Sequence, residues 1–231
     1  MSLCATILPS NEEYVKISEG CIDRAKEYFN NLEQWKLVKT SGKGQDLVEV
    51  FTKESDIVGA EDMYLLRTTY PTTVKSLAAL LYPWFPYRQQ WDALLDSAEV
   101  VKNFGDGNFI INHRTKGKYI LNPRESVDAV KILKDGMNMY FASTCAPCAD
   151  VLLPPSKQFV RTTQYLGGYR LVQLDENRVE FSMLFHADLK LSVPRLMNNI
   201  LTGLKAKLMI EKADNLRKAV KNVSISPEHL S

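Results

Sequence analysis

RVEFSMLFHADLK, residues 178–190, is the stretch of the sequence that decides the fold. Apolar side chains occupy every second position of this stretch: Val179, Phe181, Met183, Phe185, Ala187 and Leu189. Because successive side chains of a β-strand point to opposite faces, the pattern predicts a strand with one long apolar face. The opposite face carries His186 and Asp188, and for these two we expect a solvated surface.

A long amphipathic helix is predicted directly after this strand. Ser192 and Pro194 are typical of a helix start, and helical periodicity continues to about Lys221, over roughly 40 Å. The apolar stripe of this helix contains Leu196, Ile200, Leu201, Leu204 and Leu208. Between residues 195 and 221, seven Lys or Arg stand against two acidic residues, which predicts a basic opposite face. That face is either solvated or in contact with anionic lipid headgroups.

The preceding segments predict an α+β fold. Ser10 and Glu13 form a capping box that opens a helix over about residues 11–33, and three antiparallel strands follow between residues 35 and 70. Two helices are expected at 73–82 and 87–95, followed by about six strands. Two of these strands, 158–165 and 169–174, are separated by Gly167-Gly168 as a turn. A long helix can then cover the concave face of a curved antiparallel sheet.

The composition is typical of one globular domain in a reducing compartment. The chain has 231 residues, of which 45% are hydrophobic, and its net charge of +2 gives no general signal for nucleic acid. Four cysteines are too few and too scattered for a disulfide scaffold. The first residues lack the basic region of a secretory signal, and no apolar run approaches the roughly 18 residues of a membrane-spanning helix. We therefore expect a cytoplasmic protein with no nucleic-acid partner.

Few residues are available for catalysis or for a metal. The three histidines are His113, His186 and His229, and no nucleophile elbow, HExxH or phosphate loop is present. Cys145 and Cys148 form a CxxC pair, but no helix is predicted after it and no further metal ligands have a related spacing. A turn at a strand end is the better interpretation of this pair. We predict no metal, no cofactor and no enzymatic activity.

A second stretch, YPWFPYRQQWD at residues 82–92, surrounds a single arginine with aromatic residues. Aromatic residues at this density are typical of a core, and a core does not accept an unpaired guanidinium. Arg88 therefore needs an anionic partner, and Asp92 in the same stretch is one candidate.

Four strings resemble, in their order, the signature segments of START lipid-transfer domains: YRQQWD, NPRESVDAVKI, FVRTTQY and HADLKLSVPRLMNNIL. The resemblance covers roughly residues 14–220. It implies the helix-grip fold, in which a curved antiparallel sheet surrounds a tunnel that the last helix closes. It also implies a protein that carries one lipid and exchanges it between membranes. We accordingly expect a monomer with one domain over residues 11–221 and short tails at 1–10 and 222–231.

The resemblance to phosphatidylcholine-transfer members implies individual site residues. Arg88 matches the arginine that contacts the lipid phosphate in those members, and Asp92 matches its acidic neighbour. Tyr82 and Tyr165 match two tyrosines that line their headgroup site. The phosphate end of the implied site is therefore complete in this sequence.

The choline end of the implied site departs from the family pattern. His113 stands where those members have a tryptophan, and Ser126 stands where they have a tyrosine. The family's R-D string also reads Arg124-Glu125 here. A quaternary ammonium is held by aromatic faces, so the loss of two faces argues against choline selectivity.

We therefore predict a carrier of a phospholipid whose headgroup is ethanolamine, inositol or of broad type. Three alternatives remain: a sterol or ceramide carrier, a regulatory module that senses lipid without shuttling it, and, less favoured, an enzyme acting on an apolar substrate. The resemblance also implies a gate, formed by the loop at about 118–128 and the helix at 193–221. The basic face of that helix would hold the domain transiently at anionic membranes.

Overall fold

The structure is a computed structural model that describes residues 8–119, 121–191 and 198–230, with the backbone alone described at 198–201. These residues form one ten-stranded sheet, antiparallel except where β8 pairs with β6, and the strand order along its main path is β1-β2-β3-β10-β9-β7-β6-β5-β4. The strands are β1 (Lys36–Ser41), β2 (Val48–Lys53), β3 (Met63–Tyr70), β4 (Leu95–Gly105), β5 (Asn108–Thr115), β6 (Arg124–Asp135), β7 (Asn138–Cys145), β8 (Val160–Arg161), β9 (Thr163–Asp175) and β10 (Arg178–Asp188). The α+β class and the curved antiparallel sheet are as predicted.

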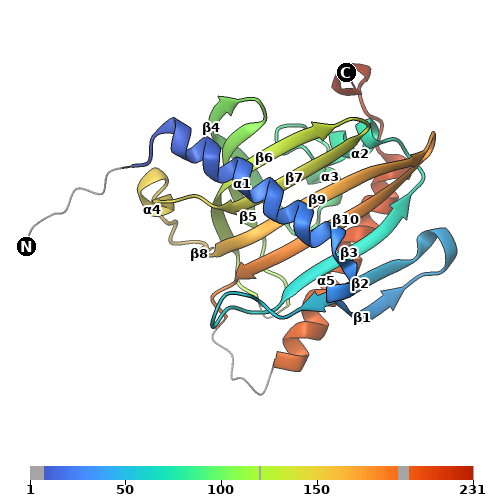
Figure 1. Ribbon diagram of the computed structural model, residues 1–231, viewed down its shortest axis with the longest axis horizontal. Helices are drawn as coiled ribbons and strands as arrows, with labels where there is room; N and C mark the ends of the chain where they lie inside the picture. The colour runs from blue at the N-terminus through green and yellow to red at the C-terminus, as the bar shows by residue number, and fades with distance from the viewer. Residues whose placement is uncertain (1–7, 120, 192–197, 231) are drawn as a thin grey trace, which may run out of the picture.

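Helices occupy the two faces and the ends of the sheet (Figure 1). They are α1 (Asn11–Asn30), α2 (Val74–Leu81), α3 (Arg88–Trp91), α4 (Ala149–Leu152) and α5 (Asn198–Asn222). The predicted capping box of α1 is present, because the Ser10 hydroxyl accepts from the Glu13 amide and the Glu13 carboxylate accepts from the Ser10 amide. Helix α1 ends at Asn30, slightly earlier than expected, and a 3₁₀ turn at Leu32–Gln34 follows it.

The sheet is covered on both faces, by α1 on one and by α5 on the other (Figure 1). In strand β3, successive side chains point alternately toward these two helices. Met63 and Leu65 pack into the cluster that contains α1, whereas the intervening Tyr64 and Leu66 pack into the cluster that contains α5. A strand that is buried on both sides needs no polar face, which explains the continuous apolar start of MYLLRTTY.

Strand β10 has the predicted apolar face, but its other face is not the solvated surface that we expected. Phe181 and Met183 point toward α5, as the alternation predicts. His186 on the opposite side is only 2% exposed, and Leu184 beside it packs with Ile22 and Ala25 of α1. The correction has a simple cause: α1, far away in the sequence, covers this face. Asp188 at the end of the strand is partly exposed.

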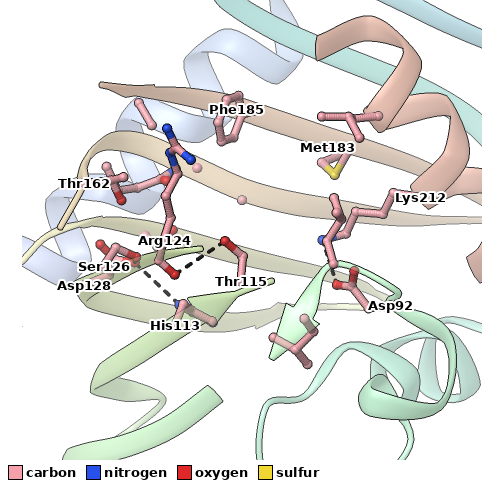
Figure 2. A pocket seen from close by; sticks show the side chains of 18 of the residues that line it. Asp92, His113, Thr115, Arg124, Ser126, Asp128, Thr162, Met183, Phe185 and Lys212 are labelled. Carbon is pink, nitrogen blue, oxygen red and sulfur yellow. Dashed lines mark hydrogen bonds and ion pairs between the residues drawn. The ribbon is translucent and has the colours of Figure 1, made fainter. Parts of the chain in front are cut away.

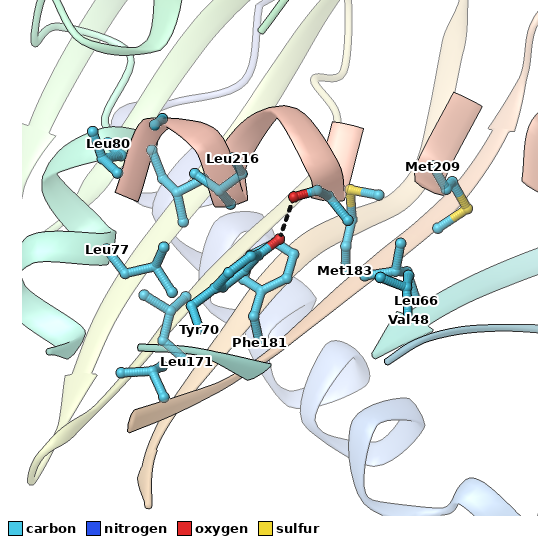
Figure 3. Close-up of a cluster of buried hydrophobic side chains, with 14 of the residues drawn as sticks. Val48, Leu66, Tyr70, Leu77, Leu80, Leu171, Phe181, Met183, Met209 and Leu216 are labelled. Carbon is cyan, nitrogen blue, oxygen red and sulfur yellow. Dashed lines mark hydrogen bonds between the residues drawn. The ribbon is translucent and has the colours of Figure 1, made fainter. Parts of the chain in front are cut away.

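Helix α5 closes the concave side of the sheet over a dense apolar core (Figure 3). Leu216 and Ala213 of α5 are buried, and Tyr70 of β3 donates a hydrogen bond from its hydroxyl to the Ala213 carbonyl at 3.0 Å. The core side chains around them include Val48, Leu66, Leu77, Leu80, Leu171, Phe181 and Met209. The C-terminal half of the helix is therefore fixed to the sheet and to α2.

Strand β9 is continuous through the glycine pair that we interpreted as a turn. Gly167 and Gly168 both lie inside β9, where they pair with Ser143 and Ala142 of β7. A Cβ atom on Gly168 would lie 2.1 Å from the carbonyl oxygen of Phe141, so the glycine permits a close approach of two strands. The two predicted strands at 158–165 and 169–174 are therefore mainly one long strand.

The CxxC pair ends β7 and precedes a short helix that the sequence analysis did not predict. Cys148 has a positive φ of 54° and caps the one-turn helix α4. Burial raises the pKa of the Cys145 thiol to about 11. A thiol with a raised pKa lacks the thiolate character that redox chemistry requires.

The cations of α5 do not form the single basic face that we predicted. Lys205 pairs with Glu61, and Lys212 pairs with Asp92 inside the fold. Arg217 is likewise buried, and it pairs with Asp46 and donates to the Thr69 carbonyl. The exposed cations of the described part of the helix are Lys207, Lys218 and Lys221. Within residues 8–119, 121–191 and 198–230, no helix has the length and apolarity that crossing a membrane requires.

The residues after α5 pack against the body of the domain, although we expected a tail from 222 onward. His229 stacks on Phe85, with ring centroids 4.0 Å apart, and its Nδ1 lies 2.8 Å from the Tyr87 hydroxyl. The Ser226 amide donates to the same hydroxyl at 2.8 Å. These contacts hold the C-terminal residues on the segment that precedes Arg88.

Gly168→Ala is expected to lower the free energy of unfolding by about 3 kcal/mol, because the new methyl group overlaps a backbone carbonyl that cannot move aside. Gly20→Ala is the matched control, since Gly20 is exposed in the middle of α1 with open space around it. The control should raise stability by about 0.5–1 kcal/mol. Urea unfolding measures both changes, and a Gly168→Ala variant as stable as the wild type would contradict the close approach.

Candidate binding cavity

A cavity of about 310 Å³ lies between the concave side of the sheet and α5. This volume falls at the lower end of the usual range for sites that enclose small molecules. Much of its wall is apolar, with contributions from Leu81, Ile111, Val130, Ile132, Phe141, Met183, Phe185, Leu189, Leu204, Leu208 and Met209. Residues of β5, β6 and β10 line the cavity on the sheet side, and residues of α5 line it on the other.

A buried charged cluster forms one side of this cavity. Arg88 and Asp92 stand four residues apart, at the start of the one-turn helix α3 and at its C-terminal cap, and Arg88 Nε lies 3.4 Å from Asp92 Oδ2. Lys212 reaches from α5 to the same oxygen, with Nζ at 2.9 Å (Figure 2). The Arg88 guanidinium also donates to the Tyr169 hydroxyl at 3.4 Å. Trp91 fixes α3 in place, because its indole donates to the Leu80 carbonyl.

The cluster carries more positive than negative charge. Burial alone would raise the pKa of Asp92, but Lys212 and Arg88 lower it to about 2. Burial also acts to raise the pKa of Tyr169, yet the same two cations outweigh it and hold this pKa below its ordinary value. Two cations therefore share one carboxylate in a site that is largely removed from water. Such an arrangement favours an anionic group as ligand.

A second polar cluster lies on β5 and β6, on the other side of the cavity (Figure 2). His113 and Ser126 are directly paired in the register of the two strands. The Ser126 hydroxyl donates to Asp128 Oδ2 at 2.6 Å, and His113 Nδ1 lies 3.5 Å from the same oxygen. The carboxylate thus lies between the serine and the histidine. In a nucleophile–base arrangement the histidine would contact the serine, so this geometry differs from a catalytic triad.

Arg124 and Glu125 begin β6 beside this cluster and have different roles. Arg124 donates from Nε to the Leu189 carbonyl at 2.9 Å, which ties β6 to the end of β10. Burial acts to raise the pKa of Glu125, but the Ser156 amide and Arg161 lower it below its ordinary value. Glu125 therefore holds the start of β6 to Arg161 of β8 and to the Ser156 amide. Because β6 starts at Arg124, the predicted gate loop at 118–128 is shorter than expected.

The structure brings six of the predicted site and lid residues to the cavity wall: Arg88, Asp92, His113, Ser126, Leu204 and Leu208. Tyr82 and Tyr165 are not among the lining residues described. Tyr82 stacks on Trp84 with ring centroids 4.9 Å apart, and Tyr165 lies against His186 at 4.9 Å. Of the remaining lid residues, Leu196 lies outside the described residues, and Ile200 and Leu201 fall where only the backbone is described.

Three cavity residues were missed in the sequence analysis: Lys212, Tyr169 and Asp128. Lys212 was counted within a basic helix face, and nothing in the local pattern indicates that it pairs with a carboxylate 120 residues earlier. Asp128 could have been found, because Arg124, Ser126 and Asp128 alternate along one face of a strand. Within the part of the chain that the structure describes, no group of three His, Cys, Asp or Glu could hold a metal ion.

A curved sheet that encloses an internal cavity beneath a long C-terminal helix defines the class of helix-grip proteins. The family model of the START domain matches residues 23–224. The chain belongs to the START family, which confirms the resemblance found in the sequence. Membership implies a lipid ligand.

Solved structures agree on the fold. Human StAR-related lipid transfer protein 5 is 22% identical with a TM-score of 0.80, and the match covers 92% of this chain and 98% of that chain. Human STARD10 is 16% identical with a TM-score of 0.64, over 94% and 83% of the two chains. The human StarD13 (DLC2) lipid transfer and protein localization domain is 11% identical with a TM-score of 0.68, over 87% and 96%. The comparison with curated protein sequences gave no match.

Asp92→Asn is expected to lower the free energy of unfolding by about 3 kcal/mol at neutral pH, because it leaves the buried Arg88 cation beside the partly exposed Lys212 without the carboxylate that pairs with both. The pKa of Asp92 is about 2 in the folded state, below its ordinary value of 3.8. The ionised carboxylate therefore contributes its full share to the free energy of unfolding above about pH 3.8, and this share is lost as the pH falls through about 2. The difference in free energy of unfolding between the wild type and Asp92→Asn should therefore become smaller between about pH 4 and pH 2.

Urea titrations over this pH range measure the gap. Asp96→Asn is the matched control, since Asp96 is an exposed carboxylate close to Asp92 in sequence, and it should leave stability almost unchanged. A constant gap across the range would show that Asp92 does not stabilise the fold through its charge.

Proposed function

We propose that this protein carries one phospholipid, with the phosphate at Arg88 and Lys212 and the acyl chains along the apolar wall. The observation that carries the proposal is the excess positive charge of the buried cluster, where two cations share Asp92. A phosphate brings the negative charge that this cluster lacks, and an arginine can bind it through two parallel hydrogen bonds. A sterol or ceramide has no phosphate, so it would leave the excess positive charge of this cluster uncompensated.

Transfer between membranes is the second part of the proposal. A two-chain phospholipid exposes roughly 30 methylenes, each worth about 0.8 kcal/mol in water. On the order of 20 kcal/mol therefore opposes its free passage through water. A carrier lowers this barrier by supplying an apolar enclosure, and the wall between sheet and α5 is suited to that task.

Closure of the cavity is supported by contacts between α5 and the loop after β5. Lys118 forms an ion pair with Glu211 of α5, and the Tyr119 hydroxyl donates to the same carboxylate at 2.7 Å. Lys207 lies over the Tyr119 ring at 4.7 Å. In our proposal these contacts are the latch of a gate that opens at a membrane surface.

Exposed cations support transient contact with anionic membranes from the cytoplasmic side. Helix α5 has three exposed cations among its described side chains: Lys207, Lys218 and Lys221. Its other cations pair with residues of the fold, as Lys212 does with Asp92. Each lysine near an anionic surface contributes about 1 kcal/mol of attraction. This contact is weak enough to be reversible, as exchange between membranes requires.

Arg88→Leu is expected to weaken phospholipid binding while the fold persists, because Asp92 keeps Lys212 as its partner. The loss should exceed about tenfold, as for a charged hydrogen bond. Native mass spectrometry of co-purified lipid and phospholipid transfer between vesicles both measure the effect. Arg178→Gln, at the exposed turn between β9 and β10, is the matched control. Absence of any lipid from the wild-type protein, together with absence of transfer, would refute the proposal.

Glu211→Ala is expected to accelerate phospholipid transfer up to about fivefold, because partly exposed ion pairs contribute at most about 1 kcal/mol. Stability in urea should change little for the same reason. Stopped-flow transfer between labelled vesicles gives the rate, with Asp214→Ala on the same helix as control. An unchanged rate would show that the contacts of Lys118 and Tyr119 do not restrain opening.

A further inference from the structure

Asp128 is a buried carboxylate whose bonding capacity is only half used. Its side chain is 3% exposed and lines the cavity. Ser126 and His113 both contact Oδ2, whereas Oδ1 has no hydrogen-bond partner among the described residues. A carboxylate oxygen that is removed from water without a donor is costly, so a donor from the ligand would restore what burial takes away.

The strand pattern explains why this carboxylate faces the ligand space. Along β6 the cavity-lining residues are Arg124, Ser126, Asp128, Val130 and Ile132. The same strand face therefore changes from polar to apolar, and Asp128 is its last polar residue before the apolar wall. A polar group that enters here would lie next to space suited to hydrocarbon.

Arg124 does not neutralise this carboxylate. Its guanidinium donates to the Leu189 and Asn122 carbonyls. Figure 2 shows the guanidinium turned away from Asp128. The contacts of the Asp128 carboxylate among the described residues are the Ser126 hydroxyl and His113, whose Nδ1 lies 3.5 Å from Oδ2.

The cavity thus has two poles of opposite sign. Lys212, with Arg88, provides the positive pole, and Asp128 provides the negative one. Figure 2 shows the Lys212 and Asp128 side chains on opposite sides of the cavity. A zwitterionic headgroup, with a phosphate and a cationic nitrogen joined by a short linker, carries the complementary pair of charges.

We propose that Asp128 binds the primary ammonium group of a zwitterionic phospholipid whose phosphate lies at Arg88 and Lys212. This inference rests on the proposed function and names the headgroup class. A primary ammonium has three N–H donors, and a carboxylate is an acceptor only, so Oδ1 gains a charge-assisted hydrogen bond. A quaternary ammonium has no N–H and needs aromatic faces, which His113 and Ser126 do not supply. A neutral hydroxyl donates without bringing the positive charge that Asp128 lacks.

A series of lipids that differ only in N-methylation tests the proposal, because each methyl group removes one donor while the charge stays constant. The full chain is incubated with vesicles that contain equal amounts of dioleoyl phosphatidylethanolamine, its monomethyl and dimethyl derivatives, and dioleoyl phosphatidylcholine. Native mass spectrometry then measures the bound share of each lipid. We expect occupancy to fall with every methyl group and the first lipid to exceed the last by about tenfold or more.

Asp128→Asn removes the charge at nearly constant shape, and it should bring that ratio close to one by lowering the bound share of phosphatidylethanolamine. Glu99→Gln is the matched control, an exposed carboxylate on β4, the edge strand beyond β5, and it should retain the full preference. If Asp128→Asn does not fold, equal occupancy of the four lipids in the wild-type protein still overturns the ammonium site.

The outcomes separate this inference from the function on which it rests. Equal occupancy by the four lipids, or an unchanged preference in Asp128→Asn, overturns the ammonium site and leaves the phospholipid carrier in place. Binding of none of the four lipids overturns both. A preference that declines with methylation and disappears in Asp128→Asn establishes the site.

Discussion

The structure depends on one constraint, which is that a single curved sheet must be buried on both of its faces. The face that meets α1 is filled by side chains from both partners, as the contacts of Leu184 with Ile22 and Ala25 show. The face that meets α5 is filled only toward the C-terminal half of that helix, around Tyr70 and Leu216. The unfilled part is the cavity. The binding site is therefore a consequence of how a twisted sheet is covered.

Charge inside such a cavity has to be balanced by precise partners, because water is largely excluded. Asp92 holds Arg88 and Lys212 together, and it leaves one positive charge over. Asp128, on the other side, is contacted by Ser126 and His113, and one of its oxygens has no donor among the residues that the structure describes. Each cluster therefore has capacity for one further group of defined sign.

Much of the fold could be predicted from the sequence, because local periodicity reports it directly. The alternation of β10, the capping box of α1 and the long final helix depend on neighbouring residues alone. His186 was misjudged because the helix that covers it lies more than 150 residues earlier in the chain. Gly167-Gly168 was misjudged for a related reason, since the close approach of β7 is invisible to local pattern.

The site was predictable to a smaller extent. Arg88 and Asp92 could be identified because a charge within an aromatic segment requires an explanation, and because the string resembles a known family. Lys212 could not, since its role appears only when α5 is folded back over α3. Asp128 stands between these cases: its inward position follows from strand alternation, but its unpaired oxygen is a property of the packed structure.

Lys212 belongs to the helix that covers the cavity, whereas Arg88 and Asp92 belong to the body beneath it. Any outward movement of this part of α5 therefore carries one of the two cations away and leaves Arg88 and Asp92 as a neutral pair. Under the proposed function, the cavity would lose its surplus charge when α5 moves outward, and its affinity for a lipid phosphate would fall. Opening and release would then be coupled through the Lys212 side chain.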